Sequence, residues 1–227
     1  MNASRFAHVS TPHGDARQST ELVTMIQARC RFGIAVAALL FCLHPAHAQS
    51  TGICVVQRIE GTAMVSAGGS APRAAQTGQA LAAADTVRTQ SQSRITLACA
   101  NNLKVVLGPD SGITVEGLLA AETQPFGVSL LDGIVGFIFK GTGGGVQVRT
   151  PSAVASVRST EWAMRWSNGV SEVFTREGTV AVSANGGSVG LGPGDGVDVS
   201  GSGEFKPVVQ WKPPRIARFG ELLGADW

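Results

Sequence analysis

Residues 49–227 lack two residue types from which many enzyme sites are built, tyrosine and histidine. The chain contains no tyrosine, and its four histidines all lie within the first 48 of its 227 residues. Residues 49–227 are therefore without the commonest general base and the commonest metal ligand. A serine triad is ruled out for the same reason. We therefore expect no enzyme activity, no catalytic residue, no metal site and no cofactor.

Acidic residues do not supply an alternative catalytic centre. A glycosidase needs only two carboxylates, but they must act as a pair. The carboxylates after residue 48 are scattered, mostly at turns and strand ends: Asp85, Asp110, Glu116, Asp132 and Asp195. We interpret them as solvated turn residues.

A hydrophobic run long enough to span a membrane is also missing. The longest run, Phe32–Leu43, has twelve residues, whereas a transmembrane helix needs ~20. Because Arg29 and Arg31 precede the run and small residues follow it, residues 25–48 are typical of a signal peptide.

The predicted leader covers residues 1–48, with cleavage expected between Ala48 and Gln49. Residues 1–24 have no place in a signal peptide, which indicates Met25 as the true start. We expect the mature protein to be periplasmic or secreted, without stable membrane insertion.

An excess of charge of one sign is absent as well. Of the 18 Lys and Arg residues four lie in the leader, and of the 16 Asp and Glu residues two do, so 14 of each remain. A formally neutral chain has no electrostatic footprint for nucleic acid or anionic lipid, and we exclude these partners.

What the chain does have is a repeated alternation of apolar and polar residues. Short segments of period two run through residues 49–205, separated by glycine and asparagine turns, and they predict half-buried strands. The clearest apolar faces are Ile95-Leu97-Cys99, Leu103-Val105-Leu107, Val146-Val148 and Trp162-Met164-Trp166, and a further one joins Val55, Ile59, Ala63 and Val65. Asn168-Gly169 and Asn185-Gly186 are typical of two-residue hairpin turns.

An internal repeat suggests how these strands are arranged. Glu60–Ser66 matches Glu177–Ser183 at five of seven positions, and each copy is followed by a leucine and then by an aspartate strand. Repeated units of this kind favour an all-β, solenoid-like stack of short strands. A β-sandwich is the alternative.

The C-terminal tail, residues 206–227, has a different pattern. Apolar spacings of three and four after Pro213-Pro214 predict one short amphipathic helix. We interpret this helix as a cap over exposed strand edges. Trp211, Phe219 and Trp227 are the candidates for contact with a partner.

Only two of the four cysteines lie outside the leader, Cys54 and Cys99. An oxidising compartment favours a disulfide between them, which would close a loop of about 45 residues and stabilise the fold by ~4 kcal/mol. Strand parity places Cys99 on an apolar face and Cys54 on a polar one, so a bulge would be needed for them to meet. Two separate thiols are the alternative.

The segment from Val146 to Met164 carries the most specific motif. It reads threonine-proline, then a run of small residues, then valine-arginine-serine-threonine before a tryptophan. The residues of this signature are Thr150, Pro151, Arg158, Thr160, Glu161 and Trp162. Together with the segments Ala84–Thr89, Ser93–Leu97 and Leu107–Ser111, it resembles the FecR-type domain family over about residues 53–200. Two positions depart from the family pattern, Ser159 and Ala84, where glycine is usual.

The resemblance implies an exported, non-enzymatic all-β module that binds or signals in the periplasm, with residues 49–205 as its FecR-type domain. In the family's transport regulators a cytoplasmic segment and a membrane helix precede this domain, so a membrane-anchored sensor of sigma-regulator type is a remote alternative. A structural envelope protein that binds glycan or peptidoglycan through an open β face is the main alternative. Either a protein or an envelope polymer is expected as partner, and exposed strand edges would permit homo-oligomers.

Overall fold

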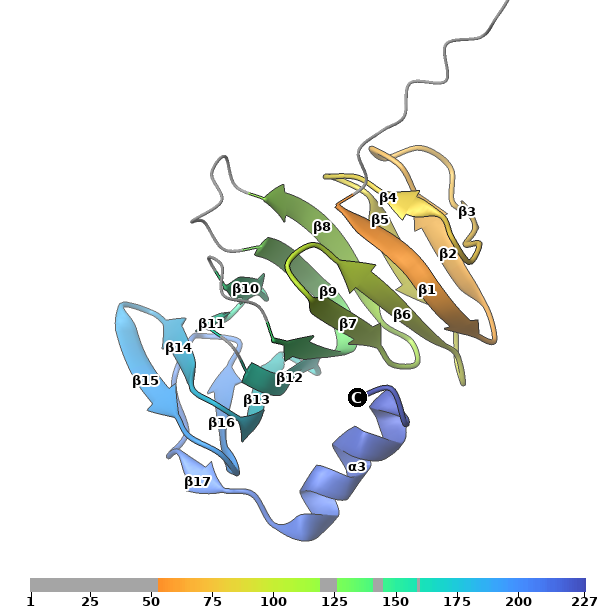
Figure 1. The fold of residues 1–227 in the computed structure, drawn as a ribbon. Coiled ribbons are helices and arrows are strands. Elements are labelled where there is room, and N and C mark those ends of the chain that lie inside the picture. The colour runs from red at the N-terminus through yellow and green to blue at the C-terminus, as the bar shows by residue number, and fades with distance from the viewer. Residues whose placement is uncertain (1–52, 119–125, 141–144, 159) are drawn as a thin grey trace, which may run out of the picture. The chain divides into compact units, whose positions relative to one another are not determined.

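The computed structural model describes residues 53–118, 126–140, 145–158 and 160–227. The described part of the chain lies within one compact unit, Ser50–Trp227. It forms strands β1 to β17 and one helix, α3 (Pro213–Leu223) (Figure 1). The leader predicted over residues 1–48, with its cleavage site at Ala48 and Gln49, lies outside the described residues.

The strands form two layers, here called sheet A and sheet B. Sheet A contains, in spatial order, β4 (Ala80–Leu81), β1 (Cys54–Glu60), β6 (Arg94–Cys99), β7 (Leu103–Leu107), residues 133–139 of β9 (Phe126–Phe139), β12 (Thr160–Ser167), β13 (Val170–Glu177), β16 (Asp195–Ser200) and β17 (Val209–Gln210). Sheet B contains β3 (Arg73–Ala74), β2 (Ala63–Ser66), β5 (Thr86–Thr89), β8 (Gly112–Leu118), residues 126–132 of β9, β10 (Val146–Arg149), β11 (Val154–Val157), β14 (Val180–Ala184) and β15 (Gly187–Leu191).

The long strand β9 joins the two layers because its first half pairs in sheet B and its second half in sheet A. The strand passes from one sheet to the other at Asp132 and Gly133. Gly133 has φ +77°, and a Cβ at this position would lie 2.5 Å from the Cα of Ser111. A residue without a side chain is therefore required at the bend.

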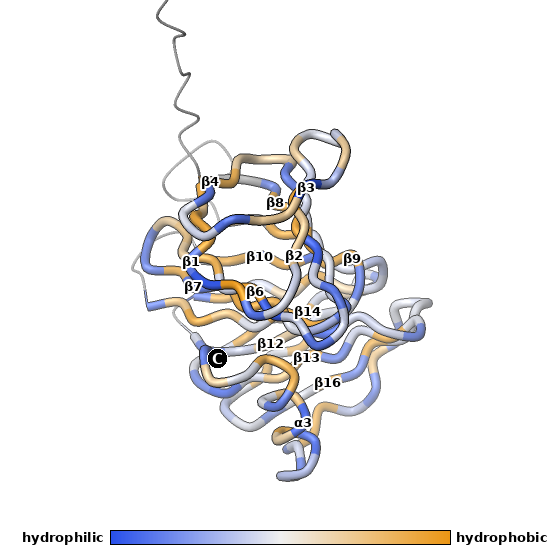
Figure 2. Tube along the Cα trace, turned by 90° about the vertical axis from the view of Figure 1, so that its right-hand side faces the viewer, coloured by the Kyte–Doolittle hydropathy of each residue, from blue (hydrophilic) through white to orange (hydrophobic). Residues whose placement is uncertain are grey.

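The core lies between the sheets and follows the alternation of the sequence. Alternate side chains of both sheets point inward, where they form one continuous buried cluster. Among those with no exposed surface are Val56, Leu97, Val105, Phe137, Trp162 and Met164 from sheet A, and Val87, Val115, Val148 and Val182 from sheet B. Figure 2 shows the corresponding apolar stretches along the strands and polar residues at many turns.

The predicted class, all-β with one short C-terminal helix, is confirmed. Two facing layers correspond to the β-sandwich alternative, whereas the solenoid-like stack was predicted from the internal repeat. The pairings among the described strands do not establish a regular solenoid repeat. Both predicted hairpin turns are confirmed, because Ser167 pairs with Val170 and Ala184 with Gly187 around two-residue loops of positive φ.

One predicted face is wrong in the first strand. The alternation placed Val55 with the apolar side chains, but Val55 is 41% exposed, whereas Cys54 and Val56 are buried. The cause is a register shift between Val56 and Arg58, where the pairing of β1 with β6 skips Gln57. This bulge reverses the parity of the residues before it.

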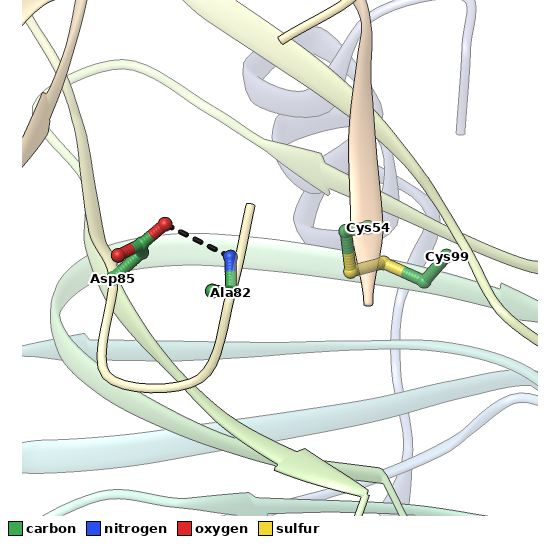
Figure 3. The surroundings of a disulfide bond; sticks show 4 residues. All are labelled: Cys54, Ala82, Asp85 and Cys99. Carbon is green, nitrogen blue, oxygen red and sulfur yellow. Dashed lines mark hydrogen bonds between the residues drawn. A yellow bond between two sulfur atoms is a disulfide. The ribbon is translucent and has the colours of Figure 1, made fainter. Parts of the chain in front are cut away.

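The internal repeat is present as structure. Gly61 (φ +77°) and Gly178 (φ +82°) both form the turn by which the chain leaves sheet A for sheet B. Each copy ends in a turn closed by its aspartate, since Asp85 accepts a hydrogen bond from the Ala82 N–H at 2.9 Å and Asp195 from the Gly192 N–H at 2.8 Å. Figure 3 shows the first of these turns.

The repeat exposes a strained position and a way to relieve it. Ala84 (φ +69°) precedes Asp85 where Gly194 (φ +83°) precedes Asp195. The left-handed region costs a residue with a side chain about 1–2 kcal/mol. Glycine avoids this strain, but it loses more conformational entropy on folding than alanine does, which offsets about half of the gain. We expect Ala84→Gly to raise the free energy of unfolding by about 0.5–1 kcal/mol, measured by urea denaturation.

The matched control is Ala82→Gly in the same turn. Ala82 is not among the residues of positive φ, so glycine there should lower stability by about 0.5 kcal/mol. Equal effects of the two variants would contradict the argument from strain.

Candidate binding surfaces

The outer face of sheet A is covered by the C-terminal tail. A second apolar cluster forms there, in which side chains of the sheet pack against the tail. Its members are Val106, Ile134, Ala163 and Phe174 from the sheet, and Trp211, Phe219, Leu223 and Trp227 from the tail. The tail therefore covers a face of the sheet, and not only strand edges as predicted.

Two glycines of sheet A make room for the tryptophans of the tail. A Cβ on Gly136 would lie 2.4 Å from the Trp227 ring, and one on Gly196 would lie 2.0 Å from the Trp211 ring. Arg176 stacks over Trp227 at 3.6 Å and Arg215 over Trp211 at 3.7 Å. The indole rings are thus held between the flat backbone of a glycine and a guanidinium plane.

The prediction that Trp211, Phe219 and Trp227 contact a partner is wrong. They are 6%, 1% and 7% exposed. The Trp227 indole N–H donates to the Trp162 carbonyl at 3.1 Å, which fixes the end of the chain on β12. Their spacing in the sequence could not reveal this cover, because the face they fill is built from β7, β9, β12 and β13.

Arg215 ties the start of α3 to sheet A. It pairs with Glu172 at 2.6 Å and with Asp198. Partial burial of the guanidinium acts to lower its pKa, but hydrogen bonds and attraction to the two carboxylates outweigh this, so the pKa of Arg215 is raised above its ordinary value. The side chain therefore stays charged wherever its partners are ionised.

The variant Trp227→Ala tests whether the C-terminal tail stabilises the fold or serves to recognise a partner. Truncating a buried tryptophan leaves a cavity, and at the chain end we expect a loss of about 3 kcal/mol of unfolding free energy. Chemical denaturation would measure the loss, with Lys212→Ala, at an exposed position of the same tail, as control. Unchanged stability in Trp227→Ala would restore the tail as a free recognition element.

The signature residues mainly build the scaffold. Thr150 bonds the buried Ser171 hydroxyl at 2.6 Å, which links the turn after β10 in sheet B to β13 in sheet A. Thr160 donates to the Glu177 carbonyl across β12 and β13. Trp162 is fully buried and stacks on Phe137 with ring centroids 4.9 Å apart.

The remaining signature residues lie nearer the surface. Glu161 pairs with Arg176 of the adjacent strand, so it ties two strands of one sheet together. Arg158 and Pro151 are exposed, and Arg158 forms no ion pair with a described residue. Ser159 lies outside the described residues.

Cys54 and Cys99 are joined by a disulfide (Figure 3). They are directly opposite each other in the pairing of β1 with β6. The bulge at Gln57 brings them to the same face, which resolves the parity conflict seen in the sequence. The bond fastens the first described strand, at the edge of the core, to the interior of sheet A.

The outer face of sheet B is the surface that no described element covers. It carries a row of hydroxyl, amide and charged side chains linked by hydrogen bonds. These are Thr86 with Thr114 at 3.2 Å, Arg88 with Asp132 at 2.8 Å, Arg149 with Gln147 at 2.6 Å, Gln147 with Ser156 at 3.2 Å, and Ser129 with Glu116. Such a face can exchange hydrogen bonds with a polar partner, and its charges are already paired.

A pocket of ≈ 420 Å³ opens at the bend of β9, between the β7–β8 turn and the β12–β13 hairpin. Asp110, Asp132, Trp166, Asn168 and Leu222 contribute to its lining. It brings together two of the turn acids that no sequence pattern had connected. Carboxylate and amide groups beside an indole ring can bind and stack against a small polar ligand.

Other site patterns have no matching geometry in the described chain. Gly186, Ser188 and Gly190 have the Gly-x-Ser-x-Gly spacing of a hydrolase elbow, but they form a hairpin turn and a strand, not a strand-to-helix turn. Among the described residues no group of three or more His, Cys, Asp or Glu could hold a metal ion. Within the same residues no helix has the length and apolar character to cross a membrane.

The fold and its surfaces define an all-β module of two facing sheets with one covered and one open face. Residues 85–181 match the family described as FecR protein, from β5 through the start of β14. The resemblance indicated by the signature is therefore confirmed over these residues.

Solved structures share the fold. Two crystal structures of a candidate anti-sigma factor from Parabacteroides distasonis ATCC 8503, at 1.65 and 2.50 Å resolution, each match with a TM-score of 0.51 and 15% identity. Each match covers 58% of this chain and 62% of that protein, so the chain spans less than two thirds of it. No curated protein matches the chain.

Proposed function

We propose that this protein is an exported, non-enzymatic FecR-domain module that binds a protein partner and signals in the periplasm. The observation that carries the proposal is that residues of the family signature serve to hold the scaffold together. Thr150, Thr160 and Trp162 hold the two sheets and the C-terminal tail together. Because these residues maintain the fold, we expect the function to depend on the surface residues that the fold presents.

The outer face of sheet B is the proposed binding surface. It is rigid, because its strands are paired on both sides from β2 to β14. Its hydroxyl and amide groups suit a polar protein surface, and the balance of charge after residue 48 fits a partner selected by hydrogen bonds rather than by net charge. The fold shared with a candidate anti-sigma factor supports a regulatory role.

Cell fractionation with mass analysis of the native N-terminus tests the export. A soluble periplasmic species that begins at Gln49 supports the proposal. An uncleaved, membrane-bound chain that keeps residues 25–48 would overturn it in favour of the anchored sensor of sigma-regulator type.

Site-specific photo-crosslinking in the producing cells tests the surface. A crosslinker at Ser156, on the open face, should trap one defined protein adduct, whereas one at the exposed Val55 of sheet A should not. Equal labelling from both positions would contradict a binding surface on sheet B.

Binding to an envelope glycan is the second candidate, and the pocket at Asp110 and Trp166 favours it. Sugar rings stack on indole, and carboxylates bind their hydroxyls. Peptidoglycan fragments should then quench tryptophan fluorescence in the wild type and less in Asp110→Ala. No quenching at millimolar fragment concentrations would reject this function.

A further inference from the structure

The edges of the two sheets are protected to different degrees. Three of the four outermost strands, β3, β4 and β17, have two residues each. The fourth, β15, has five residues, Gly187–Leu191, and no described strand pairs with its outer side. Very short edge strands are a common protection against unwanted pairing, and β15 lacks it.

The unpaired backbone groups of β15 can be assigned from its hairpin. The two-residue loop Asn185-Gly186 makes Ala184 and Gly187 the first hydrogen-bonded pair. Because backbone groups alternate in direction along a strand, Val189 and Leu191 also bond to β14. The N–H and C=O groups of Ser188 and Gly190 therefore point away from the sheet, and none of them is bonded to another described segment.

The side chains of β15 offer no other protection. The strand has no charged residue and no proline. By contrast, the incompletely paired edge of β1 carries Arg58 and Glu60, whose charges discourage strand addition. Ser188 and Gly190 are exposed, and a Cβ on Gly190 would meet nothing within 4 Å, so no neighbouring atom crowds the outer face of the strand at this position.

We propose that β15 is an association edge that pairs with β15 of a second copy of this chain, antiparallel about a twofold axis at Val189. This inference stands apart from the proposed function, since it needs neither the partner nor the open face. In this register Ser188 of each copy exchanges hydrogen bonds with Gly190 of the other. The two sheets B become one continuous sheet.

The register is favoured by the side chains as well as by the backbone. Val189, half-buried against the core, lies opposite Val189 of the second copy at a non-hydrogen-bonded position, where β-branched pairs pack well. On the other face Ser188 meets Gly190, so no bulky or charged side chains oppose each other. A strand with a glycine and a serine about its centre is thus complementary to itself.

Sedimentation equilibrium of the mature chain from about 1 to 200 µM tests the proposal, a range chosen because so small an interface should be weak. The wild type should shift from monomer toward dimer. Gly190→Pro removes the backbone N–H of residue 190 in each copy, so the symmetric pair loses two hydrogen bonds. We expect the association constant of this variant to fall more than tenfold. The change spares the β14 ladder, because this N–H points outward.

A second variant keeps the test decisive if Gly190→Pro fails to fold. Gly190→Lys places a charge in open space at the edge and should also abolish the dimer, while thermal unfolding stays as in the wild type. The matched control, Ala181→Lys, carries the same charge on the neighbouring strand β14 and should keep the dimer. A wild type that stays monomeric throughout, or a dimer that survives both Gly190 variants, would overturn the proposal.

Discussion

Val148→Asp should prevent cooperative folding or lower the free energy of unfolding by about 4 kcal/mol or more. Val148 has no exposed surface, and its neighbours in β9 and β11 are Val128 and Ala155. The variant loses the burial of a valine, worth about 1.5–3 kcal/mol, and buries a carboxylate with no partner. Urea denaturation followed by circular dichroism would measure the effect.

Gln147→Asp on the same strand is the control for this variant. Gln147 points to the open face of sheet B, beside Arg149, so a carboxylate there remains hydrated and near an opposite charge. We expect a change within about 1 kcal/mol. Similar losses at positions 147 and 148 would mean that the inward and outward faces of β10 are assigned wrongly.

Removing the disulfide should have the second largest effect. The bond between Cys54 and Cys99 closes a loop with a sequence separation of 45. On the chain-entropy model such a cross-link stabilises the native state by ~4 kcal/mol, mainly by restricting the unfolded chain. We expect the double variant Cys54→Ala with Cys99→Ala to lose about this amount in urea denaturation.

The reduced wild type provides the control, because it keeps both side chains and loses only the bond. Under reductant it should approach the stability of the double variant, which should itself not respond to reductant. Alkylation of the native protein followed by mass analysis should find no free thiol at these positions. Two alkylatable thiols together with unchanged stability would contradict the cross-link.

Alternation allowed much of the fold to be predicted without coordinates. In β10 the buried residues Val146 and Val148 alternate with Gln147 and Arg149, as period two requires. The loops Asn168-Gly169 and Asn185-Gly186 adopt the predicted hairpins, because asparagine and glycine accept positive φ. These features are local, and each can be inferred from a few neighbouring residues.

The predictions that failed involved residues distant in the sequence. The bulge at Gln57 depends on the pairing of β1 with β6, which reversed the face of Val55. Burial of Trp227 depends on Gly136, because only a residue without a side chain leaves space for the indole ring. Spacing within the tail carries no information about a glycine on another strand.

The strand content, the hairpin turns and the short C-terminal helix can be predicted from the amino-acid sequence, because each rests on local periodicity or local backbone preference, and the FecR signature is a motif of adjacent residues. The folded arrangement is needed to learn which face of which sheet the tail covers, that the two cysteines lie opposite each other, and that β15 ends its sheet without protection. These depend on which strands become neighbours. Neighbours are selected by how all the apolar faces of the chain can be buried together, and that choice is a property of the whole domain.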